Sequence, residues 1–434
     1  MLSPIMTSRI SSLQFIFLLS IFLASFSQDS LPTVDISYCS EEHTNDVREE
    51  CYSAIDGALQ IYGTFIAIGH GTVPKIAQQS FSSAEHLFRL HIEDKLNVSM
   101  NGLSRSFGRG YLPFGSEAGV STYFEVKEGY SYGFPRSGDP EKRVVNNSME
   151  SLNIWPPQLE QLHITQLELG FLEQLRITKI ILSALIKKAE TEGVRADLLN
   201  ALAPLNGGNQ QQTQRKISND GDSISLMRLF HYFSPYSEVD QVSMTTSITG
   251  DKVKNQRDGL EDITGVAEKV NIGSSPHTDW GLLTVIMQDQ TGGLEFFHDN
   301  IWKAVPIVSN GLIINGGDYL SILSQGRYHS PIHRVLCPPI GKERTSFVFF
   351  YYPGFHSSIT LKDVPNKISS RESTAHKQDG TGAINYNTFL QEDFEKDTEL
   401  DGIQATRTIT FGDYILKKWR GVTVDKVDLE LSAP

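Results

Sequence analysis

Apolar residues follow two different periods along the chain, and the change falls near its middle. Before the polar loop 206–214 they recur every three or four positions in long segments, which predicts helices. The expected elements in this half are helices over 47–61, 73–90 and 155–188 and short strands over 31–36 and 64–68. The apolar face of the last helix is formed by Ile164, Leu167, Phe171, Leu175, Leu182 and Leu185.

Beyond the loop the pattern changes to short β-type runs separated by Gly, Pro, Asn and Asp. Closely spaced short strands of this kind predict a sandwich or a barrel. The polar segments 241–269 and 356–400 read as additional loops, and a final helix is expected over 411–419. The predicted strands are 224–233, 282–287, 294–297, 303–305, 312–315, 333–337 and 345–352.

The first residues have the order of a secretory signal peptide. Arg9 precedes the apolar run 13–24, and small and polar residues follow it. The run is shorter than the ~20 apolar residues that span a bilayer. We therefore predict a signal peptide over 1–27 and a location in the secretory pathway or an endomembrane lumen if it is cleaved. The alternatives are a buried helix or an uncleaved anchor for this segment, and a cytoplasmic protein. No later segment reads as transmembrane.

The composition is that of a folded globular enzyme or binding protein. The chain has 434 residues, of which 39% are hydrophobic and 21% charged, so it can bury a sizeable core. The formal net charge is −13, and no basic stripe with interleaved aromatic residues occurs. These features argue against nucleic acid as a partner.

The chain has three cysteines, Cys39, Cys51 and Cys337. Cys39 and Cys51 could pair in an oxidising compartment, but a small and odd number is not a disulfide framework. The expectation is therefore three reduced thiols.

The segment SPHTDWG places two metal-ligating side chains beside a buried strand. Side chains alternate along an extended chain, so His277 and Asp279 point to the same side. His333, which opens a later β run, is the best third ligand. Two imidazoles and one carboxylate form the facial triad of non-haem Fe(II) oxygenases, which leaves coordination positions open. Zinc fits less well, because a catalytic zinc site usually keeps only one open position.

A carboxylate-binding pair follows on the last strand of this region. Arg344 and Ser346 share a strand face, and an arginine can bind a carboxylate with two charge-assisted hydrogen bonds. An organic acid held there could reach the metal with its other end, as a 2-oxo diacid requires. Arg344 and Ser346 are therefore predicted to serve the same site as the triad.

Three other polar residues near these motifs are given no catalytic role. His329 lies four residues before His333, but Pro331 argues against a regular strand that would align them, so His329 is placed around the site or on the surface. His70, in a Gly-His-Gly turn, is predicted to be structural. Asp318 is predicted to close a turn through backbone amides.

The sequence resembles the isopenicillin N synthase-like branch of the Fe(II)/2-oxoglutarate-dependent dioxygenase superfamily. The motifs in its second half are HTDWGLLTVIMQDQTGGLEFF, NGGDYLSILSQGRYHSPIHRV and RTSFVFFYYP. The leading half shows LPTVDIS, GALQIYGTFIAIGHG, RGYLPFG and NIWPP. The resemblance covers most of residues 31–355, and the motifs are specific in combination.

The resemblance implies a fold and a division of the chain. The fold is mainly β with flanking α-helices, around a double-stranded β-helix (jelly-roll or cupin-like) core. Residues 31–200 would form an N-terminal α/β region, 222–355 the catalytic domain, and 356–434 a polar segment with a capping helix.

The resemblance also implies roles for single residues. His277, Asp279 and His333 would bind Fe(II), and Arg344 and Ser346 would bind the distal carboxylate of 2-oxoglutarate. Tyr232 matches a tyrosine that contacts this co-substrate. His231 replaces the usual asparagine, Trp280 stands where tyrosine is commoner, and the loop between Tyr232 and His277 is longer than usual.

The implied activity is oxidation of a small organic molecule. Oxidative decarboxylation of 2-oxoglutarate by Fe(II) and dioxygen would be coupled to hydroxylation, desaturation or ring closure of the substrate, and ascorbate is a further candidate cofactor. A monomer without a membrane span is expected. One rival is an iron oxidase of the same fold that needs no 2-oxoglutarate, since some relatives keep the Arg/Ser pair without using it. The other is a non-catalytic binding protein.

Overall fold

The computed structural model describes residues 31–72, 74–100, 108–117, 123–135, 149–191, 223–235, 270–324, 326–360 and 408–423. The predicted signal peptide and the loops 206–214 and 241–269 lie outside these ranges, as does most of the polar segment 356–400. Among the described residues, no helix combines the length and the hydropathy that a membrane crossing requires.

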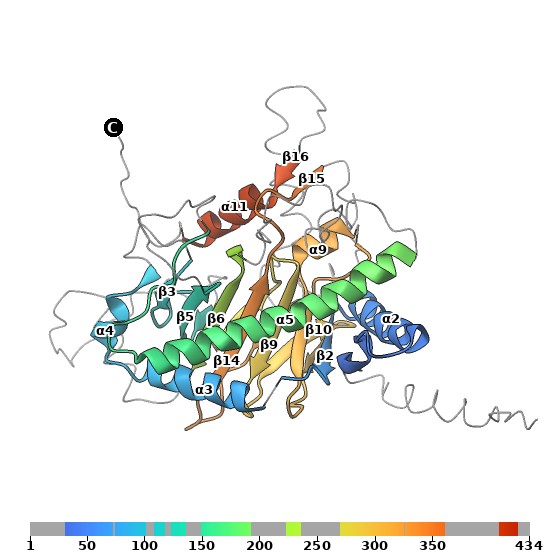
Figure 1. Cartoon of the computed structure of the whole chain (residues 1–434). Helices are drawn as coiled ribbons and strands as arrows, with labels where there is room; N and C mark the ends of the chain where they lie inside the picture. Colours follow the sequence, from blue (N-terminus) through green and yellow to red (C-terminus); the bar gives the residue numbers. More distant parts are fainter. Residues whose placement is uncertain are drawn as a thin grey trace, which may run out of the picture.

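The largest element is an eight-stranded sheet built from both halves of the chain (Figure 1). Its strands, in spatial order, are β1 (Thr33–Asp35), β2 (Thr64–Ile68), β12 (Leu312–Gly316), β9 (Leu283–Gln288), β14 (Arg344–Tyr351), β6 (Leu226–Tyr232), β5 (Lys127–Gly133) and β3 (Gly110–Leu112). Only the β1–β2 pair is parallel. The leading strands thus extend the same sheet that carries the strands of the second half.

A four-stranded sheet faces one side of the large sheet. Its order is β11 (Ile301–Ala304), β10 (Leu294–His298), β13 (His333–Val335) and β8 (Ser274–His277). One buried cluster joins the two sheets, since it contains Phe230 and Ile286 from the large sheet and Phe296 and Val335 from the small one. The two remaining pairs are β4 (Tyr123–Glu125) with β7 (Val270–Ile272) and β15 (Ser358–Thr360) with β16 (Thr408–Thr410).

Helices cover the other side of the large sheet. In Figure 1 the long helix α5 lies across the strands, and Phe171 of α5 packs edge-on against Phe349 of β14 at 5.0 Å between ring centroids. Five of the six residues predicted for its apolar face are buried, and Ile164 is half-buried. The helices are η1 (Ile36–Cys39), α2 (Asn45–Ile61), α3 (Pro74–Phe88), α4 (Ile92–Leu96), α5 (Gln161–Thr191), α9 (Asp318–Leu323) and α11 (Phe411–Thr423).

The structure is therefore mixed α/β with several sheets, and the flanking helices of the prediction are confirmed. The start of α5 differs from the prediction by six residues, because Pro156 and Pro157 disfavour helix at 155. Trp155 instead stacks on Tyr130 of β5, with ring centroids 5.3 Å apart.

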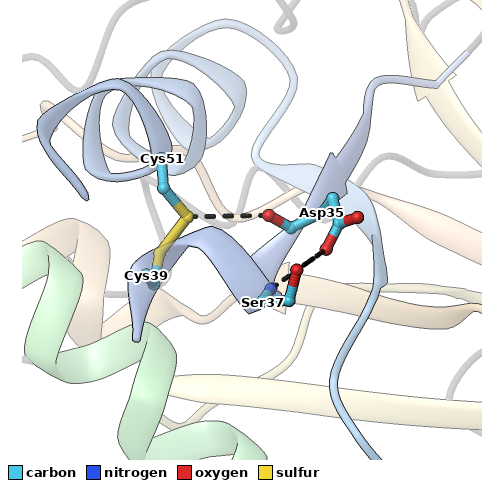
Figure 2. Close-up of a disulfide and its surroundings, with 4 residues drawn as sticks. All are labelled: Asp35, Ser37, Cys39 and Cys51. Atoms are coloured by element: carbon cyan, nitrogen blue, oxygen red, sulfur yellow. Dashed lines mark hydrogen bonds between the residues drawn. A yellow bond between two sulfur atoms is a disulfide. The ribbon is translucent and has the colours of Figure 1, made fainter. Parts of the chain in front are cut away.

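A disulfide joins Cys39 and Cys51, so the expectation of three reduced thiols is wrong for two of them (Figure 2). Cys39 ends η1 and Cys51 lies in α2, and both side chains are buried. Asp35 fixes the approach of η1, because its Oδ1 accepts hydrogen bonds from the backbone N (3.0 Å) and the hydroxyl (2.6 Å) of Ser37. The sequence spacing could not predict this contact, which depends on how α2 packs beside η1.

Replacing both Cys39 and Cys51 by serine should lower the free energy of unfolding by about 2–4 kcal/mol, since the bond restricts the unfolded chain. Denaturant unfolding of the unreduced protein measures the effect. Cys337→Ser is the control, because that thiol is free. Labelling of all three cysteines by a thiol reagent in the denatured but unreduced protein would show that the bond does not form.

Candidate active site

Three predicted ligands converge between the two sheets. His277 ends β8, Asp279 follows it, and His333 begins β13 directly opposite His277 in the strand register. The imidazole centroids are 4.3 Å apart, and His333 Nε2 lies 3.8 Å from Asp279 Oδ2. One ligand atom from each residue can be chosen so that all three lie within 4.8 Å of one another, a spacing that fits a single metal ion.

Backbone carbonyls fix the orientation of both imidazoles. His277 Nδ1 lies 2.7 Å from the Ser275 carbonyl oxygen, and His333 Nδ1 lies 3.0 Å from that of Pro331. A carbonyl oxygen can only accept, so each Nδ1 carries the proton and each Nε2 keeps its lone pair. Burial and the neighbouring His333 lower the pKa of His277, which favours the neutral, metal-binding form.

Asp279 is buried and held by its neighbours. Asn315 Nδ2 donates to Asp279 Oδ2 at 3.3 Å, and the Thr64 hydroxyl donates to Asn315 Oδ1 at 2.8 Å. The backbone N of Asp318 donates to the Asp279 carbonyl oxygen at 2.8 Å. This approach requires glycine at 317, because a Cβ there would lie 2.1 Å from the Gly281 carbonyl oxygen. The donor set therefore suits a divalent metal, with partners that orient its ligands.

The predicted carboxylate-binding residues lie together on β14 and β6. They are on the side of the large sheet that faces the small sheet, which we call the inner face. Arg344 is opposite Tyr232 in the register, and its guanidinium carbon lies 4.7 Å from the Tyr232 ring centroid. Arg344 donates from Nε to the Gly292 carbonyl oxygen at 2.7 Å and from Nη2 to Gln288 Oε1 at 3.0 Å. Its Nη1 is buried and has no hydrogen-bond partner in the part of the chain that the structure describes. The Ser346 and Tyr232 hydroxyls lie 3.5 Å apart beside it.

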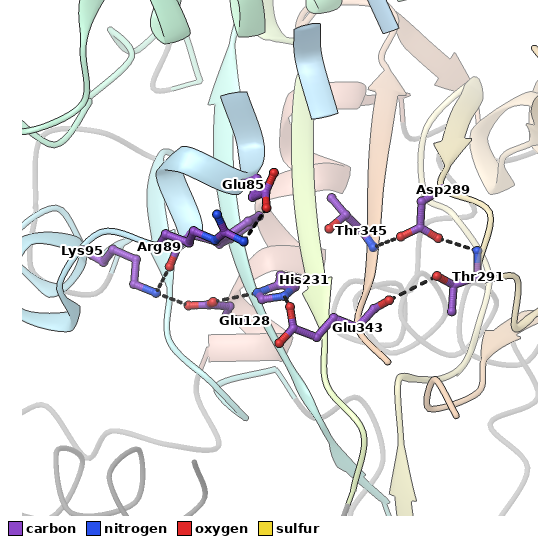
Figure 3. A network of polar contacts seen from close by, with 10 residues as sticks. Glu85, Arg89, Lys95, Glu128, His231, Asp289, Thr291, Glu343 and Thr345 are labelled. Carbon is purple, nitrogen blue, oxygen red and sulfur yellow. Dashed lines mark hydrogen bonds and ion pairs between the residues drawn. The ribbon is translucent and has the colours of Figure 1, made fainter. Parts of the chain in front are cut away.

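His231 lies on the opposite face of β6 from Tyr232, in a network of charges (Figure 3). Its Nδ1 lies 3.0 Å from Glu128 Oε1 and its Nε2 lies 2.9 Å from Glu343 Oε2. Both carboxylates accept, so both ring nitrogens carry protons. Glu128 also accepts from Lys95 Nζ at 2.7 Å and from the Tyr111 hydroxyl at 2.5 Å. His231 therefore lies on the helix-covered side of the sheet. Its contact with Glu343 joins β6 to the residue before β14, the strand that begins with Arg344.

The stability that His231 contributes should fall at alkaline pH. Burial alone would lower the pKa of His231, but Glu128 and Glu343 outweigh it and raise the pKa to about 9. The stabilisation that follows from this raised pKa is fully present below the unfolded pKa of about 6.5. It is lost as the pH rises through the folded pKa of about 9. The shift corresponds to an effect on the order of 3 kcal/mol at most, since the exposed Glu343 is screened by solvent.

This pH dependence is measured as the difference in unfolding free energy between the wild type and His231→Gln from pH 6 to pH 10. The difference should shrink towards zero above pH 9. His86→Gln, on the exposed surface of α3, is the control. A difference that stays constant over this range would contradict a charged His231.

The other three residues considered in the sequence lie outside the triad. His329 is not part of the metal-ligand group; its backbone N donates to the Leu59 carbonyl oxygen at 3.1 Å. His70 joins distant segments, because Nε2 contacts the Asn310 carbonyl oxygen at 2.7 Å and Nδ1 the Thr72 hydroxyl at 2.8 Å. Asp318 lies in the first turn of α9 and accepts from the Thr278 hydroxyl at 3.2 Å.

Sequence reasoning missed a group of charged residues on the same inner face. Lys127 of β5 lies opposite Tyr232, and its Nζ is 2.9 Å from Glu125 Oε2 and 3.5 Å from Glu117 Oε2. Glu117 Oε1 accepts from Arg228 Nη1 at 2.6 Å. The alternation of Arg228 with Tyr232 along β6 was a signal for Arg228, whereas the segments holding Glu117 and Lys127 gave no strand pattern.

Two family models match the chain. Residues 255–353 match the 2OG-Fe(II) oxygenase superfamily, and residues 31–158 match the N-terminal region described as non-haem dioxygenase in morphine synthesis. A probable iron/ascorbate oxidoreductase of Dictyostelium discoideum is 25% identical over 357 residues, 81% of this chain and 89% of the relative. The 2-oxoglutarate-dependent dioxygenase citB of Monascus ruber is 26% identical over 74% of this chain and 84% of its own length.

Solved structures show the same fold. Full-length Neurospora crassa T7H, in complex with alpha-KG, has a TM-score of 0.58 at 20% identity and covers 91% of this chain and 98% of its own. A putative 2OG-Fe(II) oxygenase family protein of Caulobacter crescentus has a TM-score of 0.58 at 18% identity, covering 91% and 99%. The two family models, the curated relatives and the triad geometry lead to one conclusion: the chain belongs to the 2OG-Fe(II) oxygenase superfamily and is an Fe(II)- and 2-oxoglutarate-dependent dioxygenase.

Proposed function

We propose that His277, Asp279 and His333 each carry the role of an iron ligand, and that Arg344, Ser346 and Tyr232 hold the distal carboxylate of 2-oxoglutarate. The observation that carries this proposal is the convergence of three ligand atoms within 4.8 Å, with both imidazoles oriented by backbone carbonyls. The buried, unpartnered Nη1 of Arg344 supports the second part, since a buried guanidinium donor calls for an anionic acceptor.

The iron and its co-substrate supply the activation of dioxygen when bound, and the chain supplies position and surroundings. Asn315 orients the Asp279 carboxylate, and the backbone N of Asp318 in α9 holds the Asp279 backbone carbonyl. The two Nδ1–H groups keep each Nε2 turned toward the metal position. Burial of Asp279, His333, Arg344 and Ser346 keeps bulk water from these groups, which strengthens each charge interaction.

The two facing sheets support a finer description of the fold. We propose that they form a double-stranded β-helix, with the two histidine ligands on the small sheet, Asp279 just after its strand β8, and the co-substrate residues on the large sheet. The buried cluster that joins both sheets supports this arrangement.

Two measurements on the purified full-length protein test the proposed function. Anaerobic addition of Fe(II) and then 2-oxoglutarate should produce the visible charge-transfer band of a chelated 2-oxo acid, and His277→Ala should abolish it. Turnover should release succinate in step with oxygen consumption. Oxygen consumption without succinate would favour an oxidase that does not use 2-oxoglutarate. The absence of both the band and oxygen consumption would favour a binding protein.

We also propose that the chain matures in an oxidising compartment. The buried Cys39–Cys51 disulfide supports this location, because such bonds persist in secretory compartments and are rare in the cytosol. The basic, apolar and small-residue order of residues 1–27 points the same way. Cell fractionation of the protein with and without residues 1–27 tests the proposal, and an unchanged cytosolic location of both forms would contradict it.

A further inference from the structure

Arg228 lies on the inner face of the large sheet, four residues before Tyr232 on β6. In the register Tyr232 faces Arg344, Phe230 faces Ser346 and Arg228 faces Val348. Alternate residues of a strand share a face, so Arg228 and Tyr232 point to the same side, roughly 13 Å apart along the strand. A group at Arg228 is thus separated from the carboxylate-binding end of the site by the length of a small molecule.

The guanidinium of Arg228 is buried and only partly used. Nη1 donates to Glu117 Oε1 at 2.6 Å, and the guanidinium carbon lies 4.5 Å from the Trp419 ring centroid. Nη2 is buried and has no hydrogen-bond partner among the described residues. A buried donor on a charged group is costly when it is left without an acceptor. Arg228 therefore has one free donor edge for an anion.

A second buried arginine in the same region is also short of acceptors. Arg109 is 1% exposed, and its Nε and Nη1 have no partner among the described residues. Its Nη2 donates to the Met149 carbonyl oxygen at 3.3 Å. Burial lowers the pKa of Arg109 to about 10, and the nearby Tyr352 hydroxyl partly opposes this.

Tyr352 and two tryptophans connect Arg228 to the metal ligands. Burial raises the pKa of Tyr352, and its hydroxyl also interacts electrostatically with Arg228, Asp279 and Arg109. Trp280, the residue after Asp279, packs edge-on against Trp419 of α11 with ring centroids 5.9 Å apart. Trp419 in turn stacks on Arg228. The two tryptophans therefore link Arg228 to the segment that carries Asp279.

Glu117 and Glu125 are the carboxylates that pair with Arg228 and Lys127. Glu117 is shared between Arg228 and Lys127, and these two charges outweigh its burial and lower its pKa to about 2. Glu125 pairs with Lys127 at 2.9 Å. Arg228 and Lys127 therefore share the Glu117 carboxylate, and Lys127 also pairs with Glu125. The hydrogen-bond acceptor of Arg109 is a backbone carbonyl, which carries no full charge. One negative charge can be accepted here without leaving an unpaired anion.

The rest of the inner face is apolar and aromatic. Phe230, Ile286 and Val348 belong to one buried cluster, with the partly buried Phe350 packed against it. We propose that the substrate oxidised here is a small organic acid whose body is apolar and ring-containing, and whose carboxylate is bound by Arg228 with Arg109 adding positive charge. The inference rests on the proposed function and specifies its substrate class.

The test measures binding of acids against their neutral amides. The probes are phenylacetate, 3-phenylpropanoate and 2-naphthoate, each paired with its primary amide, added to the full-length protein under anaerobic conditions with Fe(II) and 2-oxoglutarate. Tryptophan fluorescence reports binding, because Trp280 and Trp419 lie at the site. At least one acid should bind at least about 10-fold more tightly than its amide, since hydrogen bonds to charged groups are the stronger ones.

Variants assign this preference to Arg228. Arg228→Met should remove it, and Arg228→Lys should keep part of it. Arg228→Met alone leaves the Glu117 carboxylate without its arginine partner, so the double variant Arg228→Met/Glu117→Gln also removes that charge. The double variant should likewise lack the preference for the acid. Arg334→Met is the matched control, because Arg334 also pairs with a glutamate and stacks on a tryptophan, Glu295 and Trp302, but faces away from the site. Arg334→Met should keep the wild-type preference.

Two results would overturn the inference: no acid binds more tightly than its amide to the wild type, or the preference survives in both Arg228→Met variants. Thermal unfolding of each variant checks that it is folded. If the two Arg228→Met variants are not folded, a reduced acid preference in Arg228→Lys supports the inference and an unchanged one contradicts it. The charge-transfer band, recorded without probes, tests the proposed function separately. A band with no acid preference refutes the substrate class alone, whereas no band refutes the proposed function.

Discussion

Asp279→Ala is expected to lose ferrous iron binding and turnover together, each by on the order of a thousandfold. Loss of a residue that merely orients a metal ligand already costs ~10–100-fold in metal affinity, and loss of the only carboxylate in the triad should cost more. Anaerobic titration with Fe(II), read by equilibrium dialysis, measures the affinity, and succinate release measures turnover. The variant should fold, because removing the carboxylate also removes a buried charge.

Two further variants separate this effect from a general disturbance. Asn315→Ala should reduce iron affinity by about 10–100-fold, since Asn315 holds Asp279 Oδ2 without contacting the metal. His329→Ala should leave iron affinity near the wild-type value, because His329 is outside the ligand group. Wild-type iron affinity in Asp279→Ala, or equal losses in all three variants, would contradict the assigned triad.

The triad could be predicted from sequence because its signals are local. The two-residue spacing of His277 and Asp279 fixes their common side, and His333 opens a strand of the same region. The two-residue spacing of Arg344 and Ser346 likewise fixes their common side on β14. What the sequence could not provide was the register that places His333 opposite His277, because that pairing joins β8 and β13 across more than fifty residues.

The pattern of apolar residues did not predict η1, α4, α9 or the strands β3, β4, β5, β7, β8, β15 and β16, and β15 lies in the segment 356–400 that was expected to be a loop. β5 shows why: Lys127, Glu128 and Gly129 would normally indicate a surface turn, yet all seven residues of the strand are buried. Partners far away in the sequence make that burial possible, since Glu128 contacts Lys95 and His231, and Lys127 contacts Glu117 and Ser274. A local pattern contains no information about such partners.

The same limitation applies to the charged residues on the two sides of β6, whose partners a local pattern could not predict. His231 and Arg228 are three residues apart and point to opposite faces of the strand. Glu128 and Glu343 meet His231 on the helix-covered side, whereas Glu117 meets Arg228 on the inner side. The sequence left the role of His231 open, and only the structure shows that its partners lie outside the metal site.

Arg344→Met should raise the KM for 2-oxoglutarate by about 10–100-fold while leaving anaerobic Fe(II) affinity unchanged. Hydrogen bonds to a charged group contribute about 1.5–3 kcal/mol each, and the substitution removes the buried Nη1 that we assign to the co-substrate carboxylate. Arg344→Lys should recover only part of the affinity, because an ammonium cannot form two parallel hydrogen bonds with a carboxylate. Steady-state kinetics at varied 2-oxoglutarate measures both.

The neighbouring hydroxyls should contribute less, and their effect tests the geometry of the same site. Ser346→Ala and Tyr232→Phe each remove one neutral hydrogen-bonding group, so each should raise this KM by up to about 10-fold. Arg334→Met removes an arginine of β13 that points away from the site, on the outer side of the small sheet. It should change neither the KM for 2-oxoglutarate nor the iron affinity. If Arg344→Met kept the wild-type KM for 2-oxoglutarate, the co-substrate would have to bind through another cation. Arg228 would be the first to examine, because it is a cation on the same face and its buried Nη2 has no hydrogen-bond partner among the described residues.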